Sequence, residues 1–410
     1  MTHTSRSSRG YVGLFRHREF RALWTGNALG VAATTMASLS LGTLVYAQTG
    51  SAFLTAITMF GPSIVQVVGA GTLMSAADTA PPRLLLAGVS AVLTGALAGQ
   101  VLFDLVPASR IVVVLVAAYV MSIGSGVRWG LLAQVLPAGD YVVARSAMNV
   151  SVGVMQIVGF ATAGLVLQLV SVGQVFWLAA VLAGLSVPVT WFGIADHAPR
   201  RTGRTGITET WRGNRELLTT PSTAALMVAL CVPNGLVAGC EALFVPYAGG
   251  AAAPLFVAAA LGMLAGDVAM GRVLSPVGRR RSTAWLRIVL ALPFLAFVWH
   301  PSVPLAAVLA GIACVGYAAT LGQQELLVAL TPAHLSGQVL GAESAARVTC
   351  QGLAAALAGT LAEVVGPSHT IVVLALASLV VSMCLTPALT RTTRAVAERD
   401  ASAVGVAAAA

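Results

Sequence analysis

The segment from Asp196 to Pro221 reads DHAPRRTGRTGITETWRGNRELLTTP, and it decides how the rest of the chain is organised. It is the longest polar interval between the first hydrophobic segment and the last, and it lies close to the middle of the chain. Long hydrophobic segments flank it on both sides. We therefore expect this segment to be a cytoplasmic linker between two similar halves that are embedded in a membrane.

The composition excludes a soluble protein. Of the 410 residues, 57% are hydrophobic and only 9% are charged, and no globule of this size has enough interior to bury that share of apolar side chains. In lipid, every backbone polar group must be satisfied within helices or a closed barrel. The long runs of Ala, Leu, Val and Gly lack strict polar/apolar alternation, which favours helices. The sequence predicts an all-α polytopic membrane protein.

The hydropathy pattern predicts twelve transmembrane helices of roughly 20 residues each. They form two pseudo-symmetric six-helix bundles, 22–195 and 222–388, joined by the cytoplasmic linker 196–221. Residues 1–21 precede them as a cytoplasmic segment, and 389–410 follow as a cytoplasmic tail. We expect a short interfacial helix over Thr210–Leu218 in the linker. The expected spans are 22–47, 54–77, 83–104, 111–135, 146–170, 174–195, 222–248, 254–274, 283–299, 303–328, 338–364 and 370–388.

Arginine placement sets the expected orientation. The net charge of +9 arises from 23 basic residues, all arginine, and short cytoplasmic loops retain such charge. With twelve spans, four clusters fall on one side, which makes both termini cytoplasmic in the cell membrane. The surplus is therefore a topology signal and does not indicate nucleic-acid binding. The clusters are Arg6, Arg9, Arg16, Arg18 and Arg21; Arg200, Arg201, Arg204, Arg212 and Arg215; Arg279 to Arg281; and Arg391, Arg394 and Arg399.

No constellation for catalysis or metal binding is recognisable. The five cysteines lie in apolar segments without metal-ligand spacing, which is typical of small buried hydrophobic residues. The chain has no GxxxxGK phosphate loop, no metal-spaced His pair and no Ser/His/Asp set. We expect a protein that is not an enzyme and that needs no cofactor or metal.

The two halves resemble each other weakly. The stretch PAGDYVVARSAMN from Pro137 is matched about 195 residues later by PAHLSGQVLGAES from Pro332, and Gly164 is matched by Gly359 at the same offset. The first spans of the halves end in LVYAQTG and FVPYAGG. A duplicated six-helix unit explains these matches.

Over essentially its whole length the chain resembles the major facilitator superfamily. The likeness is greatest to bacterial exporters of drugs, macrolides and siderophores, whose N-termini read much like LFRHREFRALWTGNALG followed by LVYAQTGSAF. The family signature between spans two and three is present as MSAADTAPPR, with Asp78 and Arg83 matching and Met74 in place of Gly. Its repeat, GRVLSPVGRRR, keeps Gly271, Arg272 and Arg279. The exporter motif of span five is GFATAG, where Phe160 replaces the Pro, so this motif alone does not imply antiport.

Charged residues within the predicted spans are the candidates for function, because a charge in hydrocarbon costs about 2.5–3.5 kcal/mol on insertion scales. Arg128 matches an arginine that the family often keeps in span four; it can hold a carboxylate ionised, or simply extend to the cytoplasmic interface. Glu241 lies among the helix-breaking residues of span seven. It is a candidate proton-coupling group or substrate contact, and the alternative is a carboxylate at the rim that faces water. Asn27 and Asn234 are neutral candidates for lining a cavity between spans 1, 4, 7 and 10, although hydrogen bonds between helices are the commoner use.

Other residues are candidates for gating. The resemblance implies that Asp78, Arg83, Gly271, Arg272 and Arg279 hold the cytoplasmic side closed. Asp267 precedes Gly271 by one helical turn and serves either as a latch to the arginines of that loop or in proton transfer. Glu343 and Arg347, four residues apart, form either an intrahelical neutralising pair or a mobile gate. These two residues complete the set of candidate site residues.

The resemblance implies a monomeric secondary transporter with two bundles rocking about a midplane site. We expect proton-coupled export of a small apolar or amphipathic compound, with no nucleic-acid partner. An uptake permease or uniporter of the same fold is the first alternative. A membrane sensor or scaffold that has lost transport is the second, and the altered Met74–Pro82 signature favours it.

Overall fold

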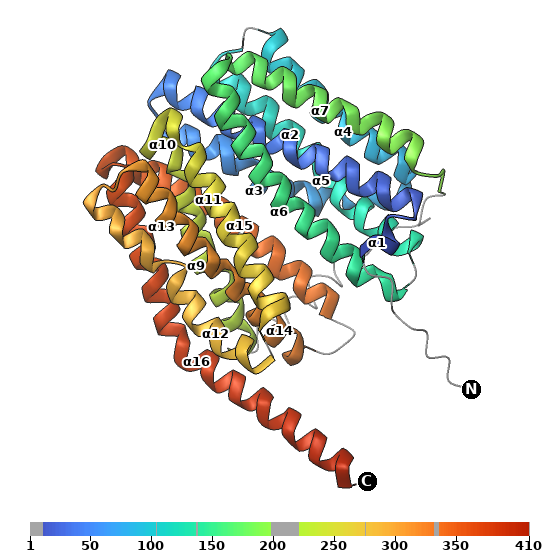
Figure 1. Cartoon of the computed structure of the whole chain (residues 1–410), viewed down its shortest axis with the longest axis vertical. Helices are drawn as coiled ribbons and strands as arrows, with labels where there is room; N and C mark the ends of the chain where they lie inside the picture. Colours follow the sequence, from blue (N-terminus) through green and yellow to red (C-terminus); the bar gives the residue numbers. More distant parts are fainter. Residues whose placement is uncertain are drawn as a thin grey trace. The chain divides into compact units, whose positions relative to one another are not determined.

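The computed structural model describes residues 11–103, 105–136, 138–197, 221–274, 276–331 and 336–409. The described residues are almost entirely helical, as Figure 1 shows. Within them, 11 helices are long and apolar enough to cross a membrane, and the shorter apolar helix Ala253–Val268 accompanies them. Most of the linker, including the helix expected over Thr210–Leu218, lies outside the described residues.

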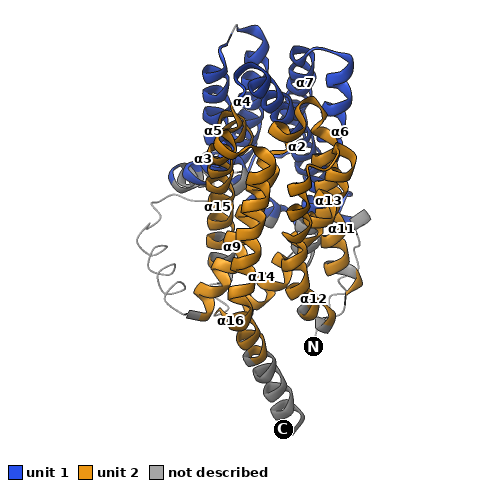
Figure 2. Ribbon diagram, turned by 90° about the vertical axis from the view of Figure 1, so that its left-hand side faces the viewer, with its two compact units in different colours: residues 1–50, 61–204 blue, residues 51–60, 205–410 orange. Residues whose placement is uncertain are grey.

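Two compact units account for the contacts, and Figure 2 colours them separately. Unit 1 contains Met1–Gly50 and Gly61–Arg204, and unit 2 contains Ser51–Phe60 and Thr205–Ala410. The first turns of the third helix are thus counted with unit 2. There, Glu363 Oε1 accepts hydrogen bonds from the Ser51 hydroxyl and from the Phe53 backbone N–H.

Unit 1 is a bundle in which α7 packs against α2 and α4, and α2 packs against α6. A buried cluster that includes Phe20, Leu86, Leu131 and Met148 holds one end of it together. The chain terminates its helices locally: Gly50 adopts a left-handed conformation after α2, and Ser171 and Gln174 form a capping box at the start of α7. The helices are α1 (Tyr11–Leu14), α2 (Arg18–Thr49), α3 (Ala52–Thr79), α4 (Pro82–Leu102), α5 (Pro107–Val135), α6 (Ala138–Leu169) and α7 (Val172–Gly193).

Unit 2 packs α9 against α15 and α16, and α11 against α13. Phe244, Phe294 and Phe297 are fully buried and form an aromatic cluster at one end of this unit. Its elements are α9 (Pro221–Ala242), α10 (Phe244–Ala248), η1 (Gly249–Ala251), α11 (Ala253–Val268), η2 (Ala269–Val273), α12 (Pro276–Val289), η3 (Leu292–Trp299), α13 (Val303–Val315), η4 (Gly316–Ala318), α14 (Ala319–Leu330), α15 (Ser336–Val365) and α16 (Pro367–Ala409).

Several spans of unit 2 differ in detail from the sequence prediction. The span expected over 283–299 is two elements, because the α-helix α12 ends at Val289 and a 3₁₀-helix begins at Leu292. Pro293 contributes to this change, since it has no N–H to continue an α-helical ladder. The span expected over 254–274 changes from α to π geometry after Val268. The helix breakers around Pro233 do not interrupt α9, which ends only at Ala242.

Candidate functional site

Glu241 lies in the interior of unit 2 with neutral partners. Its side chain is 8% exposed, and Cys314 Sγ donates to its Oε1 across 3.5 Å. The Tyr317 hydroxyl also interacts with this carboxylate. Among the described residues, no basic side chain forms an ion pair with Glu241. The carboxyl group is therefore buried without a described counter-charge.

Asn234 belongs to the same cluster. It lies seven residues before Glu241, which places both on one face of α9 two turns apart. Asn234 Nδ2 donates to the Leu230 carbonyl at 2.7 Å and to Thr320 Oγ1 at 3.1 Å, and the Tyr317 hydroxyl donates to the Asn234 carbonyl at 3.5 Å. We call Asn234, Glu241, Cys314, Tyr317 and Thr320 the Glu241 cluster.

The cluster depends on a local break in the tenth span. Between α13 and α14 the chain forms the 3₁₀ turn η4, which carries Tyr317. A Cβ atom on Gly316 would lie 2.4 Å from the backbone nitrogen of Leu290, so only glycine allows this turn to approach α12 so closely. On the facing helix, the Pro233 carbonyl accepts a hydrogen bond from Ser378 Oγ at 3.2 Å. The α9 backbone near the cluster therefore takes part in side-chain hydrogen bonds without losing its helical form.

Two members of this cluster were predicted from the sequence, and three were not. Asn234 and Glu241 were candidates, and the structure brings them together. Cys314, Tyr317 and Thr320 are neutral residues of the tenth span, and only the expectation that this span faces the seventh pointed to them. Tyr317 had one further signal, because a tyrosine within an apolar span carries a hydroxyl group that needs a partner.

A second polar group surrounds Glu343, which is fully buried on α15. Arg347 Nε donates to Glu343 Oε1 at 2.9 Å, and Gln324 Nε2 donates to its other carboxylate oxygen at 2.8 Å. Cys231 of α9 lies beside the Glu343 carbonyl. The ion pair is within one helix, and the bond from Gln324 ties α15 to α14.

The two residues of unit 1 that are candidates for substrate contact or proton coupling lie on separate helices. Arg128 is half-buried on α5, and its guanidinium makes no hydrogen bond to the described part of the chain. Its neighbour Val127 and nearby Leu131 face the buried cluster of this unit. Asn27 is buried on α2. No hydrogen bond joins Arg128 and Asn27 in the described part of the structure.

The gating candidates occupy diverse positions. Arg279 Nη1 donates to Glu325 Oε1 at 2.6 Å in an exposed ion pair between α12 and α14. Asp267 is exposed near the end of α11 and pairs with no described residue. The side chains of Asp78 and Arg272, and the surroundings of Gly271, lie outside the described part of the structure.

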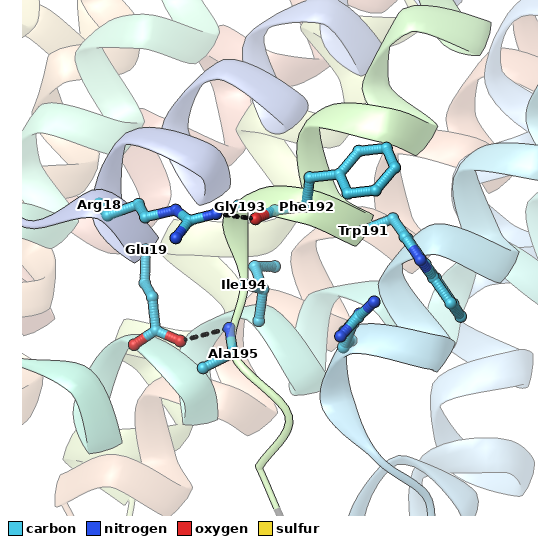
Figure 3. Close-up of a pocket in the computed structure, with 8 residues that line it drawn as sticks. Arg18, Glu19, Trp191, Phe192, Gly193, Ile194 and Ala195 are labelled. Atoms are coloured by element: carbon cyan, nitrogen blue, oxygen red, sulfur yellow. Dashed lines mark hydrogen bonds between the residues drawn. The ribbon is translucent and has the colours of Figure 1, made fainter.

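Arg83 lines a pocket of about 300 Å³ at one end of unit 1, shown in Figure 3. Its guanidinium carbon lies 4.3 Å from the centre of a Trp191 ring, a cation–π contact. Across the pocket, Arg18 donates to the Phe192 carbonyl at 2.5 Å, and Glu19 accepts from the Ala195 N–H at 2.7 Å. The start of α2 is thereby fixed to the end of α7.

Arg287 was not among the residues predicted from the sequence. It lies within the span expected over 283–299 and is only 4% exposed on α12. One of its nitrogens donates to the Ser382 carbonyl of α16, whereas its Nε has no partner among the described residues. The signal that could have revealed it was the same one used for Glu241, a charged residue inside an apolar span.

Comparison with known proteins identifies the fold. No family model and no curated protein matches the chain. Solved structures match over nearly all of it. A POT family transporter in complex with 5-aminolevulinic acid has a TM-score of 0.74 and 11% identity, with 94% of this chain and 98% of that chain covered. A mutant of the nucleoside transporter NupG has a TM-score of 0.69 and 11% identity, covering 90% and 99%.

A bacterial homologue of the human lysosomal transporter Spinster, in an inward-facing and occupied conformation, has a TM-score of 0.67 and 12% identity, with 93% and 97% covered. The likeness extends over whole chains, and the sequence identity is low throughout. The prediction of an all-α polytopic membrane protein is confirmed. This chain shares its fold with these POT family, NupG and Spinster-homologue transporter structures.

Proposed function

We propose that the chain is a secondary active transporter of the major facilitator type, which couples export of a small apolar or amphipathic compound to protons by alternating access. The fold supports a transporter, since solved structures that share it over whole chains are named as transporters. One of these structures is a complex with 5-aminolevulinic acid, and another is a nucleoside transporter. The fold therefore does not indicate the substrate class, and only this chain's own residues can indicate it.

The observation that carries the proposal is the burial of Glu241 among neutral partners. An ionised carboxylate taken out of water is costly unless it is paired. The described residues give Glu241 a thiol and a phenol but no cation. Its charge must then be neutralised by a proton or by a cationic group of the cargo. A carboxyl group that alternates between these states can link proton movement to substrate movement.

The composition of the spans supports an apolar cargo. Only 9% of the chain is charged, and much of that charge lies in the basic clusters at the predicted cytoplasmic side. The Glu241 cluster offers one carboxyl, one amide, two hydroxyls and one thiol, which suits a compound with few polar groups. The direction of export rests on the resemblance of the N-terminal sequence to bacterial exporters.

Everted membrane vesicles with an imposed pH gradient test the proposal. Vesicles that contain the wild-type chain should accumulate at least one member of a panel of dyes and antibiotics when their interior is acidic. Glu241→Gln should reduce this accumulation at least about tenfold, the size of effect expected from removing a group that exchanges protons. The matched control is Asp196→Asn, which removes an exposed carboxylate beyond the end of α7.

The outcomes separate the alternatives. Gradient-driven accumulation that survives Glu241→Gln would show that another residue couples the proton. Accumulation only in right-side-out vesicles would indicate uptake. Failure to move any compound across a broad panel, in either orientation and with or without a gradient, would favour a membrane sensor or scaffold.

A further inference from the structure

A second cavity, of about 310 Å³, lies within unit 2 and uses different residues from the Glu241 cluster. It is enclosed by α12, α14 and α16 together with Leu226 of α9. We call it the Arg287 pocket. Its inner wall carries the buried side chains Arg287 and Gln323, and its rim carries the exposed side chains Arg281 and Arg394.

Two residues that line the inner wall carry hydrogen-bond donors that lack partners. Arg287 Nε and Gln323 Nε2 are both fully enclosed and make no hydrogen bond within the described structure. Only one end of the Arg287 side chain is engaged, by the Ser382 carbonyl. Buried donors are nearly always satisfied, because leaving one unmade costs about 1–3 kcal/mol. Two such donors at one cavity point to an acceptor that binds there.

The charges of the lining residues indicate the charge of the acceptor that would bind there. Three guanidinium groups, those of Arg281, Arg287 and Arg394, line the pocket. The lining also contains one carboxylate, Glu325, which is already paired with Arg279 at 2.6 Å. A buried arginine without a counter-charge is costly. The pocket is therefore suited to an anion, and guanidinium groups favour the oxygens of phosphate or carboxylate.

The approach to the pocket indicates where the anion comes from. Val373, Leu376, Val380 and Met383 follow one another on a single face of α16, and all are half exposed or more. This spacing of three and four residues continues into Thr386 and Thr390 at the rim, and then into Arg394. In a membrane, such an apolar face contacts acyl chains. A lipid lying along this face has its headgroup at the mouth of the pocket.

We propose that the Arg287 pocket binds the phosphate of an anionic phospholipid, with Arg281 and Arg394 at the rim and Arg287 on the inner wall holding its oxygens. Arg281 and Arg287 are six residues apart on α12, which is about 9 Å along the helix and suits a headgroup that enters between them. Apolar side chains of Leu326 and Leu389 line the same cavity and suit the glycerol backbone and the first methylenes. The predicted orientation places this end of unit 2 in the cytoplasmic leaflet, where anionic lipids concentrate.

Native mass spectrometry on the full chain tests the proposal. The protein is purified in an uncharged detergent and incubated with phosphatidylglycerol or phosphatidylcholine of identical acyl chains. The wild type should retain phosphatidylglycerol in preference to phosphatidylcholine. Arg287→Gln should weaken that binding about tenfold or more, the effect of losing one charge-assisted hydrogen bond. Arg391→Gln removes an exposed charge from α16 without touching the pocket, and it should retain the preference.

Three further measurements keep the outcome decisive. If Arg287→Gln does not fold, the rim variant Arg281→Gln/Arg394→Gln changes only exposed side chains and should lose the same preference. Inorganic phosphate is added alone in a thermal-unfolding assay. Stabilisation by inorganic phosphate together with no lipid preference would overturn the assignment to a lipid. Loss of the preference in Arg83→Gln, in the pocket of unit 1, but not in Arg287→Gln would overturn the assignment to the Arg287 pocket.

Discussion

The guanidinium of Arg347 and the carboxylate of Glu343 form an ion pair between consecutive turns of α15, with Arg347 Nε 2.9 Å from Glu343 Oε1. The carboxylate is fully buried, whereas the arginine side chain is 26% exposed. Gln324 of α14 satisfies the second carboxylate oxygen at 2.8 Å. Both oxygens therefore have a donor, and one of the two donors carries the compensating charge.

We expect Arg347→Gln to destabilise the protein by about 3 kcal/mol, near the low end of the range for breaking a buried ion pair, because Arg347 is partly exposed. The loss arises mainly from leaving the buried Glu343 carboxylate without a cation. The double variant Glu343→Gln/Arg347→Gln should recover most of the loss, since it removes both charges. Thermal unfolding in detergent measures the stability of the single and double variants, and Arg391→Gln is the control at an exposed arginine. Equal instability of the single and double variants would show that the pair makes no such contribution.

The fold was predictable from the sequence because hydropathy fixes where helices of membrane-spanning length lie. In the structure, Pro107 begins α5 and Gly50 caps the end of α2, in agreement with the backbone preferences of these residue types. The change from α12 to η3 was only partly predictable. Pro293 disfavours a continued α-helix, but α- and 3₁₀-helices share nearly the same apolar composition, and one sequence does not reveal close packing such as that of Gly316 against Leu290.

The candidate site was predictable only in its charged members. Glu241 and Glu343 drew attention because charge is costly in lipid. Their partners Tyr317 and Gln324 are neutral residues on other helices, and contacts between helices leave no spacing pattern in one sequence. Arg287 carries the same signal, a charge inside an apolar span, yet it was not among the candidate residues.

Tyr317→Phe tests the Glu241 cluster without changing any charge. The substitution removes the hydroxyl that interacts with Glu241 and donates to the Asn234 carbonyl. We expect gradient-driven accumulation in everted vesicles to fall about fivefold, which corresponds to one net hydrogen bond of about 1 kcal/mol. Tyr119→Phe is the matched control, because it removes a hydroxyl that contacts Thr72 at 2.9 Å in unit 1. A comparable loss in both variants would argue against a specific role for Tyr317.

Gly159→Ala tests why the fifth-span motif GFATAG keeps its first glycine. A Cβ atom on Gly159 would lie 2.8 Å from Thr35 Cβ, so α6 and α2 would have to separate. We expect a loss of about 1–3 kcal/mol in stability, as for overpacking elsewhere. Gly95→Ala on α4 adds the same methyl group where nothing lies within 4 Å, and it should be neutral or stabilising by up to about 1 kcal/mol. Thermal unfolding compares the stability of the two variants. Unchanged stability of Gly159→Ala would contradict the close approach of α6 and α2.

A substitution in the exposed ion pair of Arg279 and Glu325 distinguishes a structural role of this pair from a gating role. The side chains are 28% and 51% exposed, and Arg279 Nη1 lies 2.6 Å from Glu325 Oε1. Exposed ion pairs contribute only about 0.2–1 kcal/mol, so Glu325→Gln should leave thermal stability almost unchanged, and any effect should shrink as salt is raised. If Arg279 also acts in the gate that the family resemblance implies, the same variant should lower the transport rate severalfold at unchanged stability. Unchanged transport together with unchanged stability would remove this pair from the gating mechanism, because a contact that holds one conformation must alter the balance between conformations when it is broken.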